Sequence, residues 1–497
     1  MRLYFTGHDY KYAAEQMLLT LFPEQRPEYP EGKPDSARIE LKLSHGDKFT
    51  TASCRMVLGG KVYHGRAAVR RELLTSELLT DRYCQRLIKN AMYRAALASG
   101  VHRPAWGALT GVRPGKIFCS LLAAGLSEDE ATRRFIDEYD VTPKRAALCR
   151  DTSRETVKAV SELGEKDVCL YVGIPFCPTR CAYCSFVSQS VEKSMKLIPP
   201  FMNALIKEVS AVGAELRALG LRVVSIYMGG GTPTTLNAAQ LDRLCTALER
   251  EFDLGALREY TVEAGRPDTI TADKLKVAYE HGVDRMSVNT QTMNDEVLKK
   301  IGRAHDSKMF LHAYEIAKNS GIKNINVDLI AGLPYDTTES FKNSIDRVIE
   351  LDPENITVHT FSVKKSSEFK AEGMFDPASV TAAESVDYSQ TALAKGGYLP
   401  YYMYRQKNTV GNLENVGYSK PGHEGLYNVY MMEEVHSIFA SGASSVTKLV
   451  SLPDENGNVR IERFFRPKYP YEYLKDCAEE DYKLGELKKA AQEFFER

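Results

Sequence analysis

Between residues 168 and 360, short apolar runs alternate with longer segments of helical periodicity. The apolar runs fit strands at Val168–Ile174, Val223–Met228, Glu259–Glu263, Arg285–Asn289, Asn324–Ile330 and Asn355–Thr360, and the segments between them fit helices at about 195–218, 237–251, 271–281, 306–319 and 337–350. Six strands that alternate with helices at this spacing predict an α/β fold with a parallel sheet. Without a nucleotide-binding G-x-G-x-x-G signal, the pattern favours a partial (β/α)6 barrel over an open doubly wound sheet.

The regions on either side of this alternation are predicted to be separate. Residues 1–165 are expected to form an α+β domain of unknown role, residues 166–365 the barrel, and residues 366–497 a mixed C-terminal region that covers the substrate. The first domain carries strand patterns at Met1–Thr6, Ala37–Ser44 and Thr50–Val57, a helix at about 11–21, and a mostly helical pattern from 67 to 164. Gly, Pro and the only Trp of the chain mark Trp106–Lys116 as a shaped loop. The last region is irregular and rich in tyrosine before a charged helix at about 470–495.

Charge and hydropathy exclude two classes of protein. The 65 basic and 66 acidic residues give a net charge of −1, which argues against a globally basic nucleic-acid binder. The mean hydropathy of −0.33 and the lack of a long apolar run argue against a membrane-spanning protein. The start of the chain has no signal-peptide pattern, so we expect a cytoplasmic location in which thiols stay reduced.

Three of the ten cysteines are grouped in a way that indicates metal chemistry. Cys177, Cys181 and Cys184 form a C-x3-C-x2-C motif directly after the first predicted barrel strand, the end at which barrels carry their chemistry. A structural zinc site would need a fourth Cys or His nearby, and the next such residue after Cys184 is Cys245. A redox pair would need only two thiols. An iron–sulfur cluster with three protein ligands would leave one iron open to a small molecule.

A glycine run follows the second predicted strand. Gly229, Gly230 and Gly231 precede Thr232, in the sequence Met-Gly-Gly-Gly-Thr-Pro-Thr. A run without side chains lets the backbone approach a ligand closely and adopt positive φ. One β–α unit after a three-cysteine loop, this run predicts a ligand-binding edge of the sheet.

Together these motifs resemble those of the radical S-adenosylmethionine enzymes. Within that superfamily, Tyr171–Cys177 and Gly229–Thr234 resemble the oxygen-independent coproporphyrinogen III oxidase group. The resemblance continues through Asp284–Gln291, Asn326–Pro334 and Lys420–His423, and so covers roughly residues 168–450. The extra N-terminal domain resembles the longer HemZ-type branch, described as coproporphyrinogen dehydrogenases.

The resemblance implies a set of cofactors and residues that bind them. It assigns Cys177, Cys181 and Cys184 to three irons of a 4Fe-4S cluster, and S-adenosyl-L-methionine to the fourth iron. The positions that match cofactor contacts are Tyr171, Tyr183, Gly229, Gly230, Gly231, Thr232, Glu263, Gln291, Arg303, Asp328 and Ser362. Glu263 suits the ribose hydroxyls or the cationic centre of the cofactor. Asp328 lies within an apolar strand and needs a partner, either Arg303 or a ligand hydroxyl. No catalytic residue is assigned.

The implied reaction is oxidative decarboxylation of coproporphyrinogen III to protoporphyrinogen IX in heme biosynthesis, by way of a 5′-deoxyadenosyl radical and in the absence of oxygen. The expected partners are a tetrapyrrole substrate and an electron donor, without nucleic acid or membrane, and we expect a monomer. Arg113, Lys116, Arg405 and Lys407 are candidates to bind the propionates.

Two departures from the group keep an alternative open. Phe186 replaces a further Cys, and Gly173 replaces a His of the best-known branch. Heme chaperones of the same superfamily also lack that Cys, so a heme-binding chaperone or another tetrapyrrole-processing protein is the alternative. A zinc- or cluster-stabilised RNA-binding protein is the weakest hypothesis, because no RNA-binding motif occurs.

Overall fold

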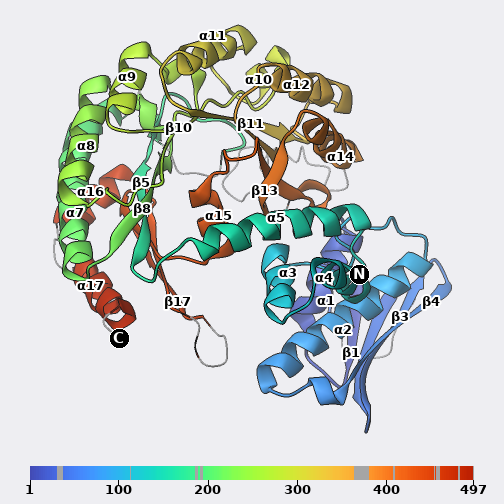
Figure 1. The fold of residues 1–497 in the computed structure, drawn as a ribbon. Coiled ribbons are helices and arrows are strands. Elements are labelled where there is room, and N and C mark those ends of the chain that lie inside the picture. Colours follow the sequence, from blue (N-terminus) through green and yellow to red (C-terminus); the bar gives the residue numbers. More distant parts are fainter. Residues whose placement is uncertain are drawn as a thin grey trace. The chain divides into compact units, whose positions relative to one another are not determined.

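The computed structural model describes residues 1–30, 37–111, 113–184, 189–190, 194–362, 380–406, 409–452, 454, 459–478 and 482–495. These residues form two compact units (Figure 1). The first contains Met1–Asp151 and Tyr404–Glu414, and the second contains most of the remaining chain from Thr152. The predicted boundary at residue 165 therefore differs from the observed one, and Tyr404–Glu414 belongs with the N-terminal unit instead of the C-terminal region.

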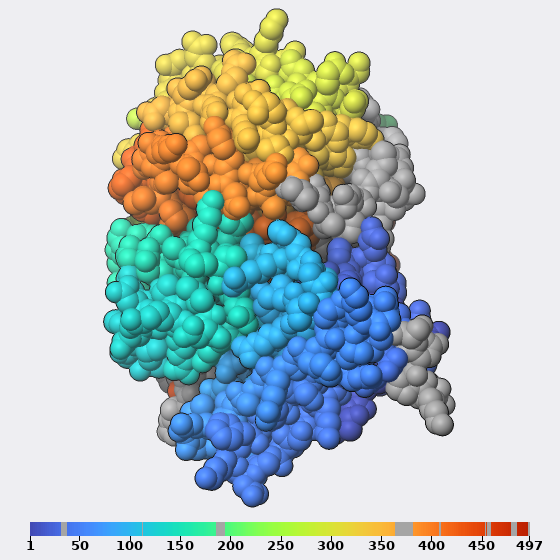
Figure 2. Space-filling model, turned by 90° about the vertical axis from the view of Figure 1, so that its right-hand side faces the viewer, coloured from blue at the N-terminus to red at the C-terminus, as the bar shows by residue number. Residues whose placement is uncertain are grey.

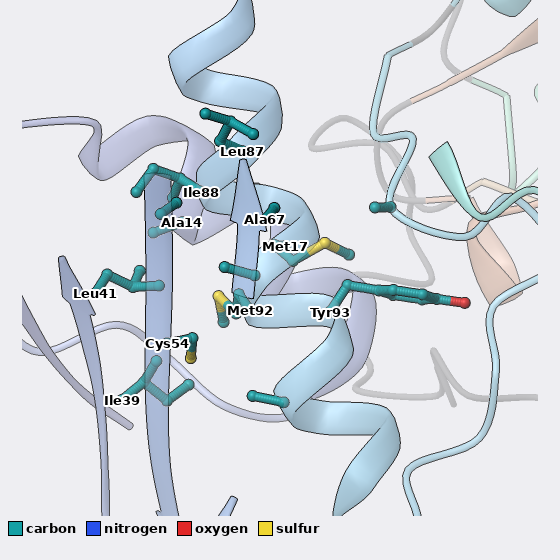
Figure 3. Close-up of a cluster of buried hydrophobic side chains, with 14 of the residues drawn as sticks. Ala14, Met17, Ile39, Leu41, Cys54, Ala67, Leu87, Ile88, Met92 and Tyr93 are labelled. Atoms are coloured by element: carbon teal, nitrogen blue, oxygen red, sulfur yellow. The ribbon is translucent and has the colours of Figure 1, made fainter. Parts of the chain in front are cut away.

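The first unit contains a four-stranded sheet. Its strands lie in the order β1 (Arg2–Thr6), β2 (Arg38–His45), β3 (Phe49–Leu58), β4 (Lys61–Arg70). β1 is parallel to β2, and the other pairs are antiparallel. Helices α1 (Lys11–Leu21) and α2 (Glu77–Ala98) contribute buried residues to the core against this sheet, as Figure 3 shows for Met17, Ile88 and Met92.

Strand β4 was not predicted from the sequence. Two features that depend on glycine explain why the strand forms. Gly59 and Gly60 both have positive φ, which suits the tight turn between β3 and β4. A Cβ at Gly65 would lie 2.0 Å from the Ala91 carbonyl oxygen, so α2 packs directly on the strand's backbone. The buried face of β4 is thus Gly65, Ala67 and Val69, which is too weakly apolar to stand out as a strand.

The rest of the first unit comprises α3 (Pro114–Ala123), α4 (Glu128–Tyr139) and the start of α5 (Pro143–Ser161). Trp106 organises the predicted loop, because its indole Nε1 donates to Glu414 Oε2 at 2.7 Å. Arg145 pairs with the other Glu414 oxygen at 2.8 Å, and all three side chains are buried. These contacts explain why a segment near residue 410 belongs to the N-terminal unit.

The second unit is built on the predicted barrel. Six parallel strands run side by side: β5 (Asp167–Ile174), β8 (Arg222–Gly230), β9 (Glu259–Glu263), β10 (Arg285–Ser287), β11 (Asn324–Ala331) and β12 (Asn355–Thr360). The connecting helices are α7 (Ile198–Ala218), α8 (Ala238–Glu251), α9 (Ala272–Glu280), α10 (Asp295–Lys300), α11 (Ser307–Lys318) and α12 (Thr338–Glu350). This confirms the predicted α/β partial barrel; only the short α10 was missed. In Figure 2 the segments from about 270 to 350 lie together on one face of this unit.

The C-terminal region extends this sheet at both edges, where the sequence predicted irregular structure. β14 (Glu414–Ser419) pairs antiparallel with β12, and β13 (Leu399–Arg405) lies beyond it. At the other edge, β15 (Ile438–Gly442) runs parallel to β5 and is followed by β16 (Val446–Val450) and β17 (Ile461–Phe465). Every residue of β14 and β15 is buried, so neither strand shows the alternation that identifies a half-exposed strand.

Helices α14 (Val380–Lys395), α15 (Leu426–Glu433), α16 (Pro470–Ala478) and α17 (Tyr482–Phe495) complete the second unit. The last two confirm the helical end predicted at about 470–495. None of the helices in the described part of the chain combines the length and apolar character that a membrane crossing requires.

Candidate functional site

The three cysteines lie in the loop that follows β5. Cys177 ends the short strand β6 (Phe176–Cys177), which pairs with β7 (Gln189–Ser190), and its Sγ is 3.3 Å from Thr232 Oγ1. The Cys184 amide donates to the Cys181 carbonyl at 3.0 Å, and the Ala182 amide donates to the Ile301 carbonyl at 3.1 Å. The loop is therefore attached both to the glycine run and to the end of α10.

The glycine run is required by the packing of two strand ends. The Gly231 amide donates to the Ile174 carbonyl at 2.7 Å, and the Thr232 amide donates to the Phe176 carbonyl at 2.8 Å. A Cβ at Gly231 would lie 2.5 Å from the Phe176 carbonyl oxygen, and Gly230 has a φ of +102°. Side chains at these positions would separate β8 from the start of the cysteine loop.

Glu263 ends β9 beside the glycine run. The Tyr227 hydroxyl donates to one carboxylate oxygen, and a Cβ at Gly229 would lie 3.3 Å from the other. Burial raises the pKa of Glu263 to about 7, although the hydrogen bond from Tyr227 opposes the shift. Among the described residues, Glu263 forms no ion pair with Lys or Arg. A partly buried acid that no lysine or arginine pairs with is expected at a ligand site.

Asp328 lies on β11, and the structure identifies its partners. Asn289 and Asn326 donate to its two oxygens at 2.9 and 2.7 Å, and His359 Nε2 lies 3.5 Å away. The expected alternatives, Arg303 or a ligand hydroxyl, are thus not needed to explain its burial. Burial lowers the pKa of His359, but the hydrogen bond to Asp328 and the negative charges of Asp328 and Glu263 together raise it. The Gln291 amide donates to the Asp328 carbonyl at 3.0 Å, with Gln291 at a φ of +72°.

Arg303 is buried beside the cysteine loop. Its Nη1 donates to the Gly265 carbonyl at 3.3 Å, and no acceptor in the described part of the chain reaches its Nε. Burial lowers the pKa of this guanidinium, but its interactions with Tyr183, Cys181 and Asp268 together raise it. A buried donor without an acceptor is rare, so Arg303 suits the carboxylate of a bound ligand.

The remaining predicted positions lie on neighbouring strands. Tyr171 on β5 stacks with Tyr227 at a centroid distance of 6.2 Å, and Tyr227 stacks with Tyr427 of α15 at 4.4 Å. Burial raises the pKa of Tyr171 above its ordinary range, so the phenol stays neutral. Ser362 follows β12, directly after Phe361, whose amide donates to the Ala331 carbonyl at 2.9 Å.

These residues suit the cofactors that the motifs imply. Thiolates are the ligands that iron–sulfur clusters use, and the acceptors Glu263 and Asp328 and the spare donor of Arg303 suit a ligand with hydroxyl and carboxylate groups. Within the ranges that the structure describes, no three His, Cys, Asp or Glu side chains converge on one point as a single-ion site would require. The thiolates of a 4Fe-4S cluster bind different irons, so they need not converge in this way.

One propionate-binding candidate, Arg405, is wrong. Arg405 is buried, donates to the carbonyls of Leu109 and Gly111 at 2.7 and 3.1 Å, and packs on Trp106. Its guanidinium therefore supports the N-terminal loop instead of facing a substrate. Arg113 and Lys116 belong to the first unit, and Lys407 and the Phe186 departure fall outside the described residues.

The structure gives a physical reason for the departure at Gly173. A Cβ there would lie 2.7 Å from the Ala443 carbonyl oxygen, because β15 pairs with β5 at this position. Gly442, its partner in the register, has a φ of +98° and would place a Cβ 2.2 Å from the Gly173 carbonyl oxygen. A histidine at position 173 is incompatible with this strand pairing.

Sequence reasoning missed five polar side chains of the site: Tyr227, Arg266, Asn289, Asn326 and His359. Asn326 and Asp328 are two residues apart on a strand, so they share a face, and this spacing was a usable signal. The others are single polar residues at strand ends, and only the fold brings them together.

A separate cavity of about 240 Å³ lies at the opposite, amino ends of β9 and β10. Its lining includes Glu259, Asp284 and Arg285. Arg285 pairs with Glu259, and Asp284 accepts the Tyr260 amide at 2.7 Å. The chain itself therefore supplies partners for the charged groups of this cavity.

Comparison with known proteins agrees with this fold. Residues 171–348 match the model of the radical SAM superfamily. The solved structure of coproporphyrinogen III oxidase HemN from Escherichia coli, itself described as a radical SAM enzyme, superimposes with a TM-score of 0.50 at 23% identity, over 68% of this chain and 73% of that one. The fold and the three-cysteine site thus define a radical SAM protein.

Two curated relatives narrow the family. The oxygen-independent coproporphyrinogen-III oxidase-like protein HemZ of Bacillus subtilis (strain 168) is 35% identical over 92% of this chain and 91% of the relative. The heme chaperone HemW of Lactococcus lactis subsp. lactis (strain IL1403) is 32% identical over 55% of this chain and 68% of the relative. This chain belongs to the HemZ-type family of oxygen-independent coproporphyrinogen-III oxidase-like radical SAM proteins, which also resemble the HemW chaperones.

Proposed function

We propose that this protein catalyses the oxygen-independent oxidative decarboxylation of coproporphyrinogen III to protoporphyrinogen IX. The observation that carries the proposal is the gathering of three thiols, a glycine run and two partly buried acids at the carboxyl edge of one parallel sheet. The near-complete match to a protein named as oxidase-like supports this reaction over that of the shorter chaperones. An external electron donor and a final acceptor are part of the proposal.

Under this proposal, each residue of the site has a defined role. Cys177, Cys181 and Cys184 hold the 4Fe-4S cluster, and Arg303 Nε donates to the carboxylate of S-adenosylmethionine. Glu263, oriented by Tyr227, accepts hydrogen bonds from the ribose hydroxyls. When bound, the cluster and S-adenosylmethionine would supply a 5′-deoxyadenosyl radical in each of two rounds. In each round one propionate chain would give up a hydrogen atom, carbon dioxide and one electron, which the acceptor takes, and would become a vinyl group.

An anaerobic product assay tests the proposal. Protein reconstituted with iron and sulfide is incubated with coproporphyrinogen III, S-adenosylmethionine and a reductant, and methionine and protoporphyrinogen IX are quantified. We expect both products from the wild type and neither from C181A. C245A is the matched control, because Cys245 is a buried cysteine of α8 remote from the motif, and it should keep activity.

Two results would contradict the proposal. Cleavage of S-adenosylmethionine without any porphyrin product would exclude this substrate. Heme that stays bound through gel filtration, without turnover of coproporphyrinogen III, would favour the chaperone function instead.

A further inference from the structure

Arg266 is a buried arginine directly behind the cysteine loop, and no motif accounts for it. It follows β9 and precedes the single turn η4 (Pro267–Thr269), after Gly265 at a φ of +56°. Its side chain is 3% exposed, and its Nη1 lies 3.5 Å from Cys181 Sγ. A buried cation beside one of the three cysteines needs a reason, because its desolvation is costly.

All five N–H donors of this guanidinium have acceptors. Nε and Nη2 donate to the two Asp268 oxygens at 3.0 and 3.2 Å, which is a bidentate pair. Nη2 also donates to Thr179 Oγ1 at 3.0 Å, and Nη1 to the Thr179 carbonyl at 3.4 Å. The fifth donor is directed at Cys181 Sγ, so none is left for a substrate or for S-adenosylmethionine.

The backbone that presents Arg266 is fixed to the glycine-run motif. Thr234 Oγ1 donates to the Ala264 carbonyl at 3.0 Å and lies 2.6 Å from Thr269 Oγ1. The Thr269 hydroxyl also lies 2.8 Å from the Arg266 carbonyl oxygen and donates to it. The turn that carries the guanidinium is therefore braced on both sides, which limits its movement relative to the cysteines.

We infer that Arg266 is a positioning residue that fixes the Cys181 segment of the loop and raises the reduction potential of the proposed cluster. The inference rests on the proposed cluster, but not on the identity of the substrate. Hydrogen bonds to the cysteine sulfurs and nearby charge are among the factors that set iron–sulfur potentials. A positive charge stabilises the reduced cluster, which carries one more electron, and Asp268 partly offsets that charge.

Two substitutions with opposite electrostatic sign test this role. The midpoint potential of the cluster is measured by anaerobic titration with dithionite, with the reduced cluster followed by electron paramagnetic resonance. R266Q should lower the ratio of reduced to oxidised cluster about tenfold at a fixed potential, equivalent to about 59 mV for one electron. D268N removes the compensating charge and should shift the potential upward. R266K keeps the positive charge but lacks the planar guanidinium that donates to Asp268, Thr179 and Cys181. Its potential should therefore lie between those of R266Q and the wild type.

Circular dichroism and iron content are measured on every variant, because loss of cluster would mimic loss of function. Equal potentials for the wild type, R266Q and D268N at full iron content would overturn the inference. Shifts of the same sign in R266Q and D268N would also overturn it, because they would indicate a general disturbance of the loop. A wild type that takes up no iron would overturn the cluster itself. Opposite shifts in protein that forms no porphyrin product would support this inference and contradict the proposed reaction.

Discussion

Two glutamates at opposite ends of β9 have very different surroundings. Glu259 begins the strand, pairs with Arg285 at 3.4 Å, and accepts the amides of Leu426 and Tyr427 at 2.6 and 3.2 Å. Glu263 ends the strand four residues later and has the neutral hydroxyl of Tyr227 as its hydrogen-bond donor. Burial raises the pKa of both acids, but only at Glu259 does an arginine oppose that shift.

This difference separates structure from function within a single strand. At the amino end, the chain supplies a cation and two amides, so the acid joins β9 to β10 and to α15. At the carboxyl end the acid keeps unused acceptor capacity beside the glycine run and the cysteine loop. An acid at a ligand-binding edge that no arginine or lysine pairs with is a better candidate for ligand binding than one that an arginine pairs with.

The largest expected effect comes from breaking the pair at the amino end. R285A leaves Glu259 buried without its cation, which should lower the free energy of unfolding of the apoprotein by about 3–5 kcal/mol. Urea unfolding measures this. The control is R258A, which removes the neighbouring pair of Arg258 with Glu162 and should cost about 0–1 kcal/mol. Equal losses for the two variants would show that the Arg285 pair is not structural.

A smaller effect on folding, but a clear effect on binding, is expected at the carboxyl end. E263Q should fold normally and weaken S-adenosylmethionine binding about tenfold or more, because a charged hydrogen-bond acceptor is lost. Anaerobic calorimetry on cluster-loaded protein measures the affinity. E280Q, on the exposed face of α9, is the matched control and should bind like the wild type. Unchanged affinity in E263Q would remove Glu263 from the site.

The smallest effect is a dependence of stability on pH. Because the pKa of Glu263 is raised from 4.5 to about 7 on folding, the folded apoprotein binds this proton more tightly than the unfolded chain does. The stabilisation of the folded state by this proton is complete below about pH 4.5 and is lost as the pH rises through about 7. Between pH 5 and 7, the free energy of unfolding of the wild type should fall by at most about 2 kcal/mol relative to that of E263Q.

The melting temperatures of both proteins across this range measure that difference. Y227F should move the loss to higher pH, because the Tyr227 hydrogen bond lowers the pKa of Glu263. Parallel curves for the wild type and E263Q would show that Glu263 ionises as it would in water.

The sequence predicted what depends on local pattern. The six barrel strands were found because apolar runs and helical segments alternate, and the cysteine loop was found because its motif follows a strand. Glu263 was proposed because it matches an acidic position of the family. The partners of Asp328 could not be predicted, because Asn289 and His359 come from strands that only the folded sheet brings beside β11. Arg405 was wrongly predicted to bind propionates, since nothing local shows that it packs on Trp106 and donates to two backbone carbonyls.

The most direct test of the account follows the hydrogen atom from substrate to cofactor. Coproporphyrinogen III deuterated on its propionate chains is incubated anaerobically with the loaded wild-type protein, S-adenosylmethionine and a reductant, and 5′-deoxyadenosine is analysed by mass spectrometry. The account predicts 5′-deoxyadenosine that is heavier by one deuterium, formed together with protoporphyrinogen IX. Unlabelled 5′-deoxyadenosine, formed at the same rate with or without the porphyrinogen, would contradict it.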